Sequence, residues 1–180
     1  METAYTSSAS ETVIAKPRIE TVVTDLDNTL FDWVEMWGAS FTALLDVLLR
    51  KSRIPRDMLL PEIRAVHQQH HTAEYAFLLQ DLPSLKRLHP DDDVTVVYAD
   101  AIQAYKDARA ASLHLYPGVQ ETLSRLKTAG CRIIGYMESQ SFYSSYRVRT
   151  LGLDGVLDAL FSPADHDRPA DFKRSKPDDA

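Results

Sequence analysis

The sequence contains a single cysteine, Cys131, and no long run of apolar residues. One cysteine excludes a disulfide within the chain and any metal site built from several cysteines. A membrane-spanning helix needs about 20 consecutive apolar residues, which no segment provides. Acidic residues outnumber basic ones, 26 to 20, for a net charge of -6, whereas nucleic-acid-binding proteins usually have a concentrated basic face. We therefore expect a cytoplasmic protein with no membrane or nucleic-acid partner.

The two ends of the chain differ in composition from its middle. Residues 1–17 are rich in Ser, Thr, Ala and Glu and have little to bury, which is typical of a mobile leader. Residues 163–180 are dominated by polar and charged side chains, with Phe172 as their single large apolar residue, which is typical of a solvated tail. We expect the folded part of the chain to lie between these segments.

Three short apolar segments have the character of buried strands. Residues 19–24 contain a β-branched run, and residues 131–137 and 157–161 are again apolar. Helical patterns at residues 117–130 and 139–151 precede the second and third of these segments. This alternation predicts an α/β fold with a Rossmann-like parallel sheet and right-handed crossovers.

The segment that follows the first predicted strand is helical in pattern almost throughout. Apolar residues recur at helical spacing over residues 33–53, and Pro55 ends this helix. A second helix is predicted to begin near Pro61, because proline is tolerated at a first helical position, and its apolar stripe runs to Phe77. A third helix is predicted after Asp93, since acidic residues favour a helix N-terminus.

These patterns predict two structural units. Residues 18–32 and 111–162 are expected to form the α/β core, and residues 33–110 a helical cap inserted after the first strand. Ligands of parallel sheets bind beyond the carboxyl ends of the strands. Asp25 and Asp27 directly follow the first strand, so we expect them at the ligand site.

Asp25, Asp27 and Thr29 form the pattern Asp-x-Asp-x-Thr. Two carboxylates this close repel each other, and a hard cation with oxygen ligands would relieve the repulsion. One carboxylate could attack an electrophile while the other moves a proton. The alternative is an ordinary Asp-Asn turn, in which the side chains cap local backbone amides.

Several motifs that are far apart in the chain point to one family. They are DLDNTLFDW after a strand, a helical insertion, LYPGVQETLSRLKTAGCRIIGY, and LGLDGVLDALFSP. Over about residues 19–164 the chain resembles the haloacid dehalogenase-like superfamily of aspartate-nucleophile phosphohydrolases, in its branch with a helical cap after the first strand. The resemblance implies a Mg²⁺-dependent phosphatase that acts on a small phosphorylated metabolite.

The resemblance also implies roles for the two aspartates. By position in the motif, Asp25 would attack phosphorus, form an aspartyl-phosphate and ligate Mg²⁺. Asp27 would protonate the leaving group and then activate water, and its backbone carbonyl would also reach the metal. Family branches that cleave carbon–halogen bonds or phosphonates lack an aspartate at this place, so Asp27 favours phosphate esters. An aspartyl-phosphate divides one difficult hydrolysis into two easier steps.

Two later motifs of the family match the sequence less well. The family expects a hydroxyl residue after the second strand, but Met137 stands there, and a thioether cannot donate a hydrogen bond. Ser139, two residues on, either supplies the phosphate-binding hydroxyl or caps the following helix. Lys176, before Pro177, is either the phosphate-binding lysine of the family or part of the polar tail, with Lys173 as a weaker candidate.

The last motif of the family is an acidic pair after a further strand, which has no counterpart before Ala180. We therefore expect a chain truncated at the C-terminus, with an incomplete core. The missing strand would lie beside the first, so residues 19–24 would form an exposed edge that permits self-association. Met137 and the missing motif leave open an alternative function, that of a catalytically inactive remnant acting through protein contacts.

Overall fold

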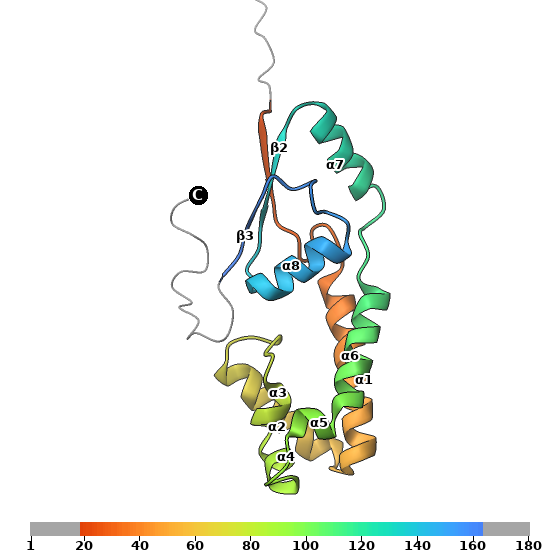
Figure 1. Ribbon diagram of the computed structural model, residues 1–180, viewed down its shortest axis with the longest axis vertical. Helices are drawn as coiled ribbons and strands as arrows, with labels where there is room; N and C mark the ends of the chain where they lie inside the picture. The colour runs from red at the N-terminus through yellow and green to blue at the C-terminus, as the bar shows by residue number, and fades with distance from the viewer. Residues whose placement is uncertain (1–18, 164–180) are drawn as a thin grey trace, which may run out of the picture.

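The computed structural model describes residues 19–163. The predicted leader at residues 1–17 lies outside this range, as does the predicted tail with Lys176, apart from Pro163. Three parallel strands form one sheet in the order β1-β2-β3 (Figure 1). They are β1 (Thr21–Thr24), β2 (Arg132–Tyr136) and β3 (Ala159–Phe161). The α/β fold and the parallel sheet that the sequence predicts are confirmed.

The strands are joined by helical crossovers. Helix α7 (Val119–Thr128) precedes β2, and helix α8 (Ser141–Thr150) connects β2 to β3. Within β2, Gly135 has a packing reason: a Cβ atom there would lie 2.9 Å from Cδ1 of Leu160 on β3. A larger residue would therefore push β3 or its side chains away from the sheet.

Six helices lie between β1 and α7. They are α1 (Trp33–Ser52), α2 (Arg56–Gln69), α3 (Leu78–Asp81), α4 (Pro83–Leu88), α5 (Val94–Val97) and α6 (Ala99–Ser112). Helices α1 and α6 run side by side away from the sheet, and α2 to α5 gather at their far end (Figure 1). Within residues 19–163, no helix is both long and apolar enough to cross a membrane.

Helix α1 begins and ends where the sequence predicts. Asp32 is its N-cap, and Oδ1 of Asp32 accepts a 2.8 Å hydrogen bond from the backbone N–H of Glu35. The helix ends at Ser52, and Pro55 follows as the first residue that could not continue it.

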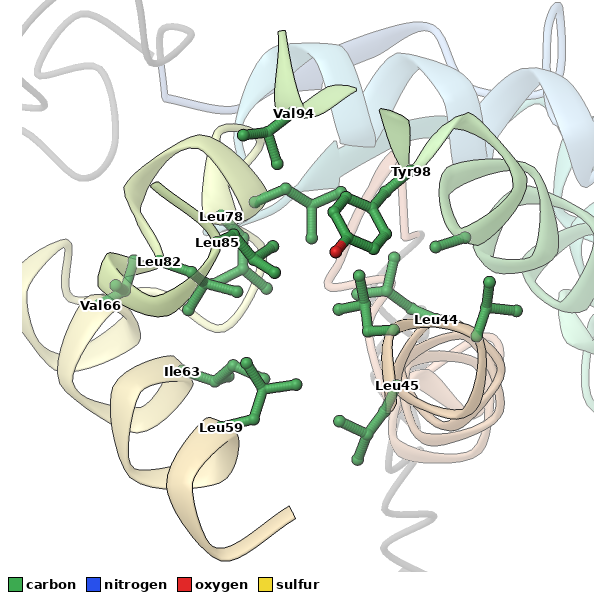
Figure 2. Close-up of a cluster of buried hydrophobic side chains, with 14 residues drawn as sticks. Leu44, Leu45, Leu59, Ile63, Val66, Leu78, Leu82, Leu85, Val94 and Tyr98 are labelled. Carbon is green, nitrogen blue, oxygen red and sulfur yellow. The ribbon is translucent and has the colours of Figure 1, made fainter. Parts of the chain in front are cut away.

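Buried apolar side chains form two clusters. One cluster joins the helices: Leu44, Leu45, Val47, Leu48, Leu59, Ile63, Val66, Leu78, Leu79, Leu82, Leu85, Val94, Tyr98 and Ala101 (Figure 2). The other joins the sheet to its helices: Leu26, Leu30, Phe31, Met36, Leu113, Leu123, Ile133, Met137, Val148, Leu151 and Leu153. Helix α1 contributes Met36 to the second cluster and Leu44 to the first, so one rigid element joins both.

The prediction that the second helix begins near Pro61 is wrong. Helix α2 begins at Arg56, contains Pro61 in its interior and ends at Gln69. The cause is burial: Leu59 lies in the extra first turn and is completely buried in the helical cluster. This burial offsets the backbone hydrogen bond that proline cannot donate.

The stripe predicted to continue to Phe77 also ends early. His71 has a φ of 53°, in the left-handed region, and the chain leaves the helix there. Phe77 is consequently outside α2 and exposed. The third predicted helix begins after Asp93, as expected, but it breaks at Tyr98 into α5 and α6, where the tyrosine ring enters the helical cluster.

Strand β1 lies at one side of the sheet. Among the described residues it pairs with β2 alone, and Val23 is 63% exposed. An exposed apolar strand edge is a surface on which other chains can pair, so self-association through β1 stays a prediction.

Asp158 ties the start of β3 to two neighbouring elements. Its carboxylate accepts hydrogen bonds from Nζ of Lys127 at 2.7 and 2.8 Å and from the backbone N–H of Ile133 at 2.7 Å. The bond from Lys127, with that from Ile133, lowers the pKa of the Asp158 carboxyl below its ordinary value. The stabilisation from a group with a lowered pKa is present above its ordinary pKa and is lost as the pH falls through the folded-state pKa.

We predict that Asp158→Asn lowers the Tm at neutral pH and that the difference from the parent protein shrinks below about pH 4. Thermal unfolding followed by circular dichroism between pH 3 and pH 7 checks this, with approximate pH limits set by the ordinary aspartate pKa. Asp154→Asn is the matched control, because the Asp154 carboxylate lies 3.9 Å from an exposed Arg149. Equal Tm values for Asp158→Asn and the parent at every pH would contradict the prediction.

Candidate active site

The loop after β1 is shaped by the residues between and after the two aspartates. Leu26 is completely buried in the cluster that joins the sheet to its helices, while Asp25 is exposed. Asn28 has a φ of 58°, a left-handed conformation that asparagine tolerates. Its Oδ1 accepts hydrogen bonds from the backbone N–H groups of Trp33 at 3.0 Å and Val34 at 3.3 Å. The loop therefore turns directly into α1.

The ordinary-turn explanation accounts for Asn28 but not for Asp27. Asn28 and Asp32 supply the side-chain oxygens that bond the first backbone N–H groups of α1. The Asp27 carboxylate is instead bonded to groups from a distant part of the chain. Oδ2 of Asp25 lies 3.5 Å from the Thr29 hydroxyl, within the same loop.

Asp27 is held by a hydroxyl and a guanidinium. Oγ of Ser139 donates a 2.6 Å hydrogen bond to Oδ2 of Asp27. Nη1 of Arg147 donates to the same carboxylate, at 2.9 Å to Oδ2 and 3.2 Å to Oδ1. Nη1 of Arg147 also lies 2.6 Å from Oγ of Ser139, so the three groups form one network.

Arg147 extends this network to the helical part of the chain. Its Nη2 is paired with Oε1 of Glu74, a residue between α2 and α3, and the Arg147 side chain is 1% exposed. The Ser139 hydroxyl also lies 3.4 Å from Oε2 of Glu74. A buried guanidinium needs partners for its N–H groups, and here two carboxylates from opposite sides of the site supply them.

Burial changes the proton affinity of Asp27. Loss of solvent around its carboxyl raises its pKa above the ordinary value, and the charge of Arg147 and the hydrogen bond from Ser139 oppose this shift. The negative charges of Glu74 and Asp25 add to the increase. A carboxyl group with a raised pKa keeps its proton more readily near neutral pH, which suits a group that must donate one.

Met137 and Ser139 follow β2, and they differ from the family pattern at this place. Met137 is completely buried in the cluster that joins the sheet to its helices. The prediction that Ser139 caps the next helix is wrong, because the N-cap of α8 is Gln140 and no side-chain hydrogen bond caps that helix. The Ser139 hydroxyl reaches across to Asp27 instead, which brings it into the site.

Arg147 and Glu74 were not predicted from the sequence. Arg147 belongs to a helix whose buried face consists of Tyr143, Ser144, Arg147 and Val148. Two of these four residues are polar, so the sequence pattern does not mark this face as buried or separate Arg147 from the exposed Arg149. The sequence around Glu74 does not mark it as a site residue, because its role depends on a contact with Arg147, 73 positions later.

The carboxylates of the site are the groups that could bind Mg²⁺. Three carboxylates, those of Asp25, Asp27 and Glu74, influence one another around the single guanidinium of Arg147. Within residues 19–163, no group of three or more His, Cys, Asp or Glu side chains is arranged to hold a metal. Mg²⁺ often binds through one or two carboxylates while keeping several waters. The excess negative charge and the exposed Asp25 fit such a water-rich site.

We predict that Arg147→Met destabilises the protein by about 3–5 kcal/mol, because it leaves the carboxylates of Asp27 and Glu74 facing each other without a cation. Urea unfolding at neutral pH measures this change. Arg149→Met, two residues away on an exposed position of the same helix, is the control and should change stability by less than about 0.5 kcal/mol. Equal stabilities of the two variants would show that the network does not hold the site together.

Comparisons with known proteins identify the family. Residues 19–180 match the family model of the haloacid dehalogenase-like hydrolases. Among curated proteins, no relative with significant similarity was found.

Two solved structures share the fold. A Thermotoga maritima protein assigned as a beta-phosphoglucomutase is 20% identical, with a TM-score of 0.52, and a haloacid dehalogenase-like family hydrolase from Xanthomonas campestris is 13% identical, with a TM-score of 0.51. Each match covers 79% of this chain and 60% of the other. This chain therefore spans about 60% of the length of these relatives. Because the family model matches most of the chain, the protein belongs to the haloacid dehalogenase-like hydrolase family.

Proposed function

We propose that this hydrolase is a Mg²⁺-dependent phosphatase that uses Asp25 as its nucleophile and acts on a small phosphorylated metabolite in the cytoplasm. One observation carries the proposal. Asp27 is a partly buried carboxyl group with a raised pKa, held by Ser139 and Arg147, two positions from the exposed carboxylate of Asp25. One aspartate is thus accessible to an electrophile, and the other is suited to hold a proton.

In the first step, an oxygen of the Asp25 carboxylate attacks phosphorus and the bond from phosphorus to the ester oxygen breaks. Asp27 gives its proton to the departing oxygen, so the leaving group departs as an alcohol. In the second step, Asp27, now ionised, takes a proton from water as that water attacks phosphorus. Phosphate departs, the Asp25 carboxylate is regenerated, and Asp27 is protonated again.

The residues of the site fit a role for Mg²⁺. The carboxylate of Asp25 and the backbone carbonyl of Asp27 would hold the ion, with water as further ligands. When bound, Mg²⁺ neutralises charge on the phosphoryl oxygens. Carboxylates outnumber the single guanidinium of Arg147 in this site. Without a further cation, they would repel the negatively charged phosphate ester. Lys176, the predicted phosphate-binding lysine, lies outside the described residues.

We predict that Asp25→Asn reduces hydrolysis of 4-nitrophenyl phosphate to background and that Asp27→Asn lowers kcat by about 10²–10⁴-fold, the usual contribution of a general acid–base. Removal of Mg²⁺ with EDTA should abolish activity, and added Mg²⁺ should restore it. Asp32→Asn is the matched control in the same loop, because asparagine caps a helix as well as aspartate does. Equal, EDTA-resistant rates in Asp25→Asn and the parent would contradict the proposal.

We further predict that Ser139→Ala lowers kcat/KM by about ten- to a hundredfold, because a hydrogen bond to a charged group is worth about 1.5–3 kcal/mol. Ser139→Thr keeps the hydroxyl and should retain most of the activity. The same assay with 4-nitrophenyl phosphate measures both variants. If alanine and threonine have the same effect, the hydroxyl has no part in the reaction, and Ser139 would then be a packing residue.

A second candidate function is favoured by two observations. Met137 occupies the place of the family's phosphate-binding hydroxyl and is buried in the apolar cluster. Strand β1 has one partner strand among the described residues, and Val23 on it is exposed. These features suit a catalytically inactive protein that acts through protein contacts at β1. A protein that self-associates while showing no Mg²⁺-dependent hydrolysis would have this second function.

A further inference from the structure

The carboxylate of Glu74 occupies two donors that an anionic substrate could use. Nη2 of Arg147 is paired with Oε1 of Glu74, and the Ser139 hydroxyl lies 3.4 Å from Oε2. The Glu74 side chain is 9% exposed, so this carboxylate is held inside the site. Carboxylate and phosphoryl oxygens bind the N–H groups of an arginine in the same way. Glu74 therefore lies where an oxyanion would bind.

These two donors lie beside the proposed reaction centre. Asp27 accepts hydrogen bonds from Ser139 at 2.6 Å and from Arg147 at 2.9 Å. An ester oxygen that receives the proton of Asp27 must come within hydrogen-bond reach of that carboxyl group. The other oxygens on the same phosphorus atom then lie next to Ser139 and Arg147, in the position that Glu74 fills.

Protein carboxylates already engage the donors of the site. The Ser139 hydroxyl has a single proton, which it donates to Asp27. Arg147 donates to Asp27 through Nη1 and is paired with Glu74 through Nη2. A phosphate ester would add further negative charge beside the guanidinium that these two carboxylates share. The ester therefore has to replace one of them.

Glu74 is the carboxylate that the ester can replace. Asp27 follows the completely buried Leu26 in the loop after β1, and the proposed reaction requires it. Glu74 belongs instead to the loop between α2 and α3, which reaches from the helical part of the chain toward α8 (Figure 1). The proposed reaction assigns Glu74 no step, so its departure from Arg147 removes no reacting group.

The loop between α2 and α3 holds Glu74 in place from both sides. The carbonyl of Ala73 accepts a 3.0 Å hydrogen bond from Nε1 of Trp37 on α1. The hydroxyl of Tyr75 donates a 2.8 Å hydrogen bond to Oδ2 of Asp81 on α3. Both neighbours of Glu74 are thus anchored to helices, and together they present its side chain to the site.

We propose that Glu74 is autoinhibitory: its carboxylate occupies the place of the phosphoryl group on Ser139 and Arg147 and must leave before a phosphate ester binds. When Glu74 leaves, the phosphoryl oxygens replace it as partners of the buried guanidinium. The inference rests on the proposed phosphatase function for the identity of the ligand. It does not rest on hydrolysis, because binding of inorganic phosphate to the same donors is measured without turnover.

Isothermal titration calorimetry with inorganic phosphate in the presence of Mg²⁺ tests the inference. Glu74→Gln removes the charge and keeps the shape of the side chain, so we expect it to bind phosphate about ten- to a hundredfold more tightly than the parent. Glu138→Gln is the matched control, because it removes the same charge from an exposed residue next to Ser139 and should change the affinity by less than about twofold. Equal or weaker phosphate binding in Glu74→Gln would overturn the inference, as would an equal gain in Glu138→Gln.

A double variant locates the bound phosphate. Adding Ser139→Ala to Glu74→Gln removes one of the two proposed donors and should weaken phosphate binding again by about ten- to a hundredfold. An unchanged affinity would place the phosphate elsewhere and would also overturn the inference.

Hydrogen–deuterium exchange of the parent protein tests the displacement even if Glu74→Gln folds poorly. Loss of the contact with Arg147 loosens the loop that carries Glu74, so added phosphate should speed exchange of the backbone amides of residues 72–76. Sodium chloride at the same ionic strength is the control and should leave these rates unchanged. A ligand that binds beside Glu74 without displacing it would protect the loop. Slower or unchanged exchange with phosphate would therefore contradict the autoinhibitory role.

These measurements separate the inference from the proposed function. Tighter phosphate binding by Glu74→Gln, in a protein that hydrolyses no phosphate ester, would support the autoinhibitory role and count against the phosphatase alone. Hydrolysis by a protein whose phosphate affinity does not depend on Glu74 would overturn the autoinhibitory role alone.

Discussion

The buried guanidinium of Arg147 joins three parts of the chain that are distant in sequence. It pairs with Asp27 after β1, contacts Ser139 after β2 and pairs with Glu74 between α2 and α3. A cation that is 1% exposed is stable only while its partners stay in place. The position of the Asp27 carboxyl and the position of the helical segment that carries Glu74 are therefore coupled through one side chain. Movement of that segment away from the sheet would leave the guanidinium short of a partner.

The two hydrophobic clusters also connect the sheet to the helices. Helix α1 enters both clusters, through Met36 near the sheet and Leu44 near the far helices, so one helix joins them. The Arg147 network makes a second connection, between the loops after β1 and β2 and the segment that carries Glu74. Closure by the helices would exclude water from the phosphoryl group, and the electrostatic interactions inside would become stronger.

The sequence was sufficient to predict those elements whose structure depends on interactions between neighbouring residues. The β-branched run before Asp25, the start of α1 at Trp33 and its end before Pro55 depend on a few adjacent residues, and they were predicted correctly. Helix α2 was placed wrongly because burial of Leu59 outweighs the cost of Pro61, and burial depends on tertiary packing. Arg147 was missed for the same reason. Its exposure differs from that of Arg149 only because of what α8 packs against.

The central claim is that Asp25 carries the phosphoryl group during turnover. Borohydride reduces an acylphosphate to an alcohol, so trapping the protein during hydrolysis of 4-nitrophenyl phosphate should convert Asp25 to homoserine. Peptide mass spectrometry of the segment that contains β1 measures this conversion directly. The account predicts homoserine at position 25 with substrate and Mg²⁺, and unchanged aspartate when either is left out. Unmodified Asp25 in a preparation that is hydrolysing the ester would contradict it.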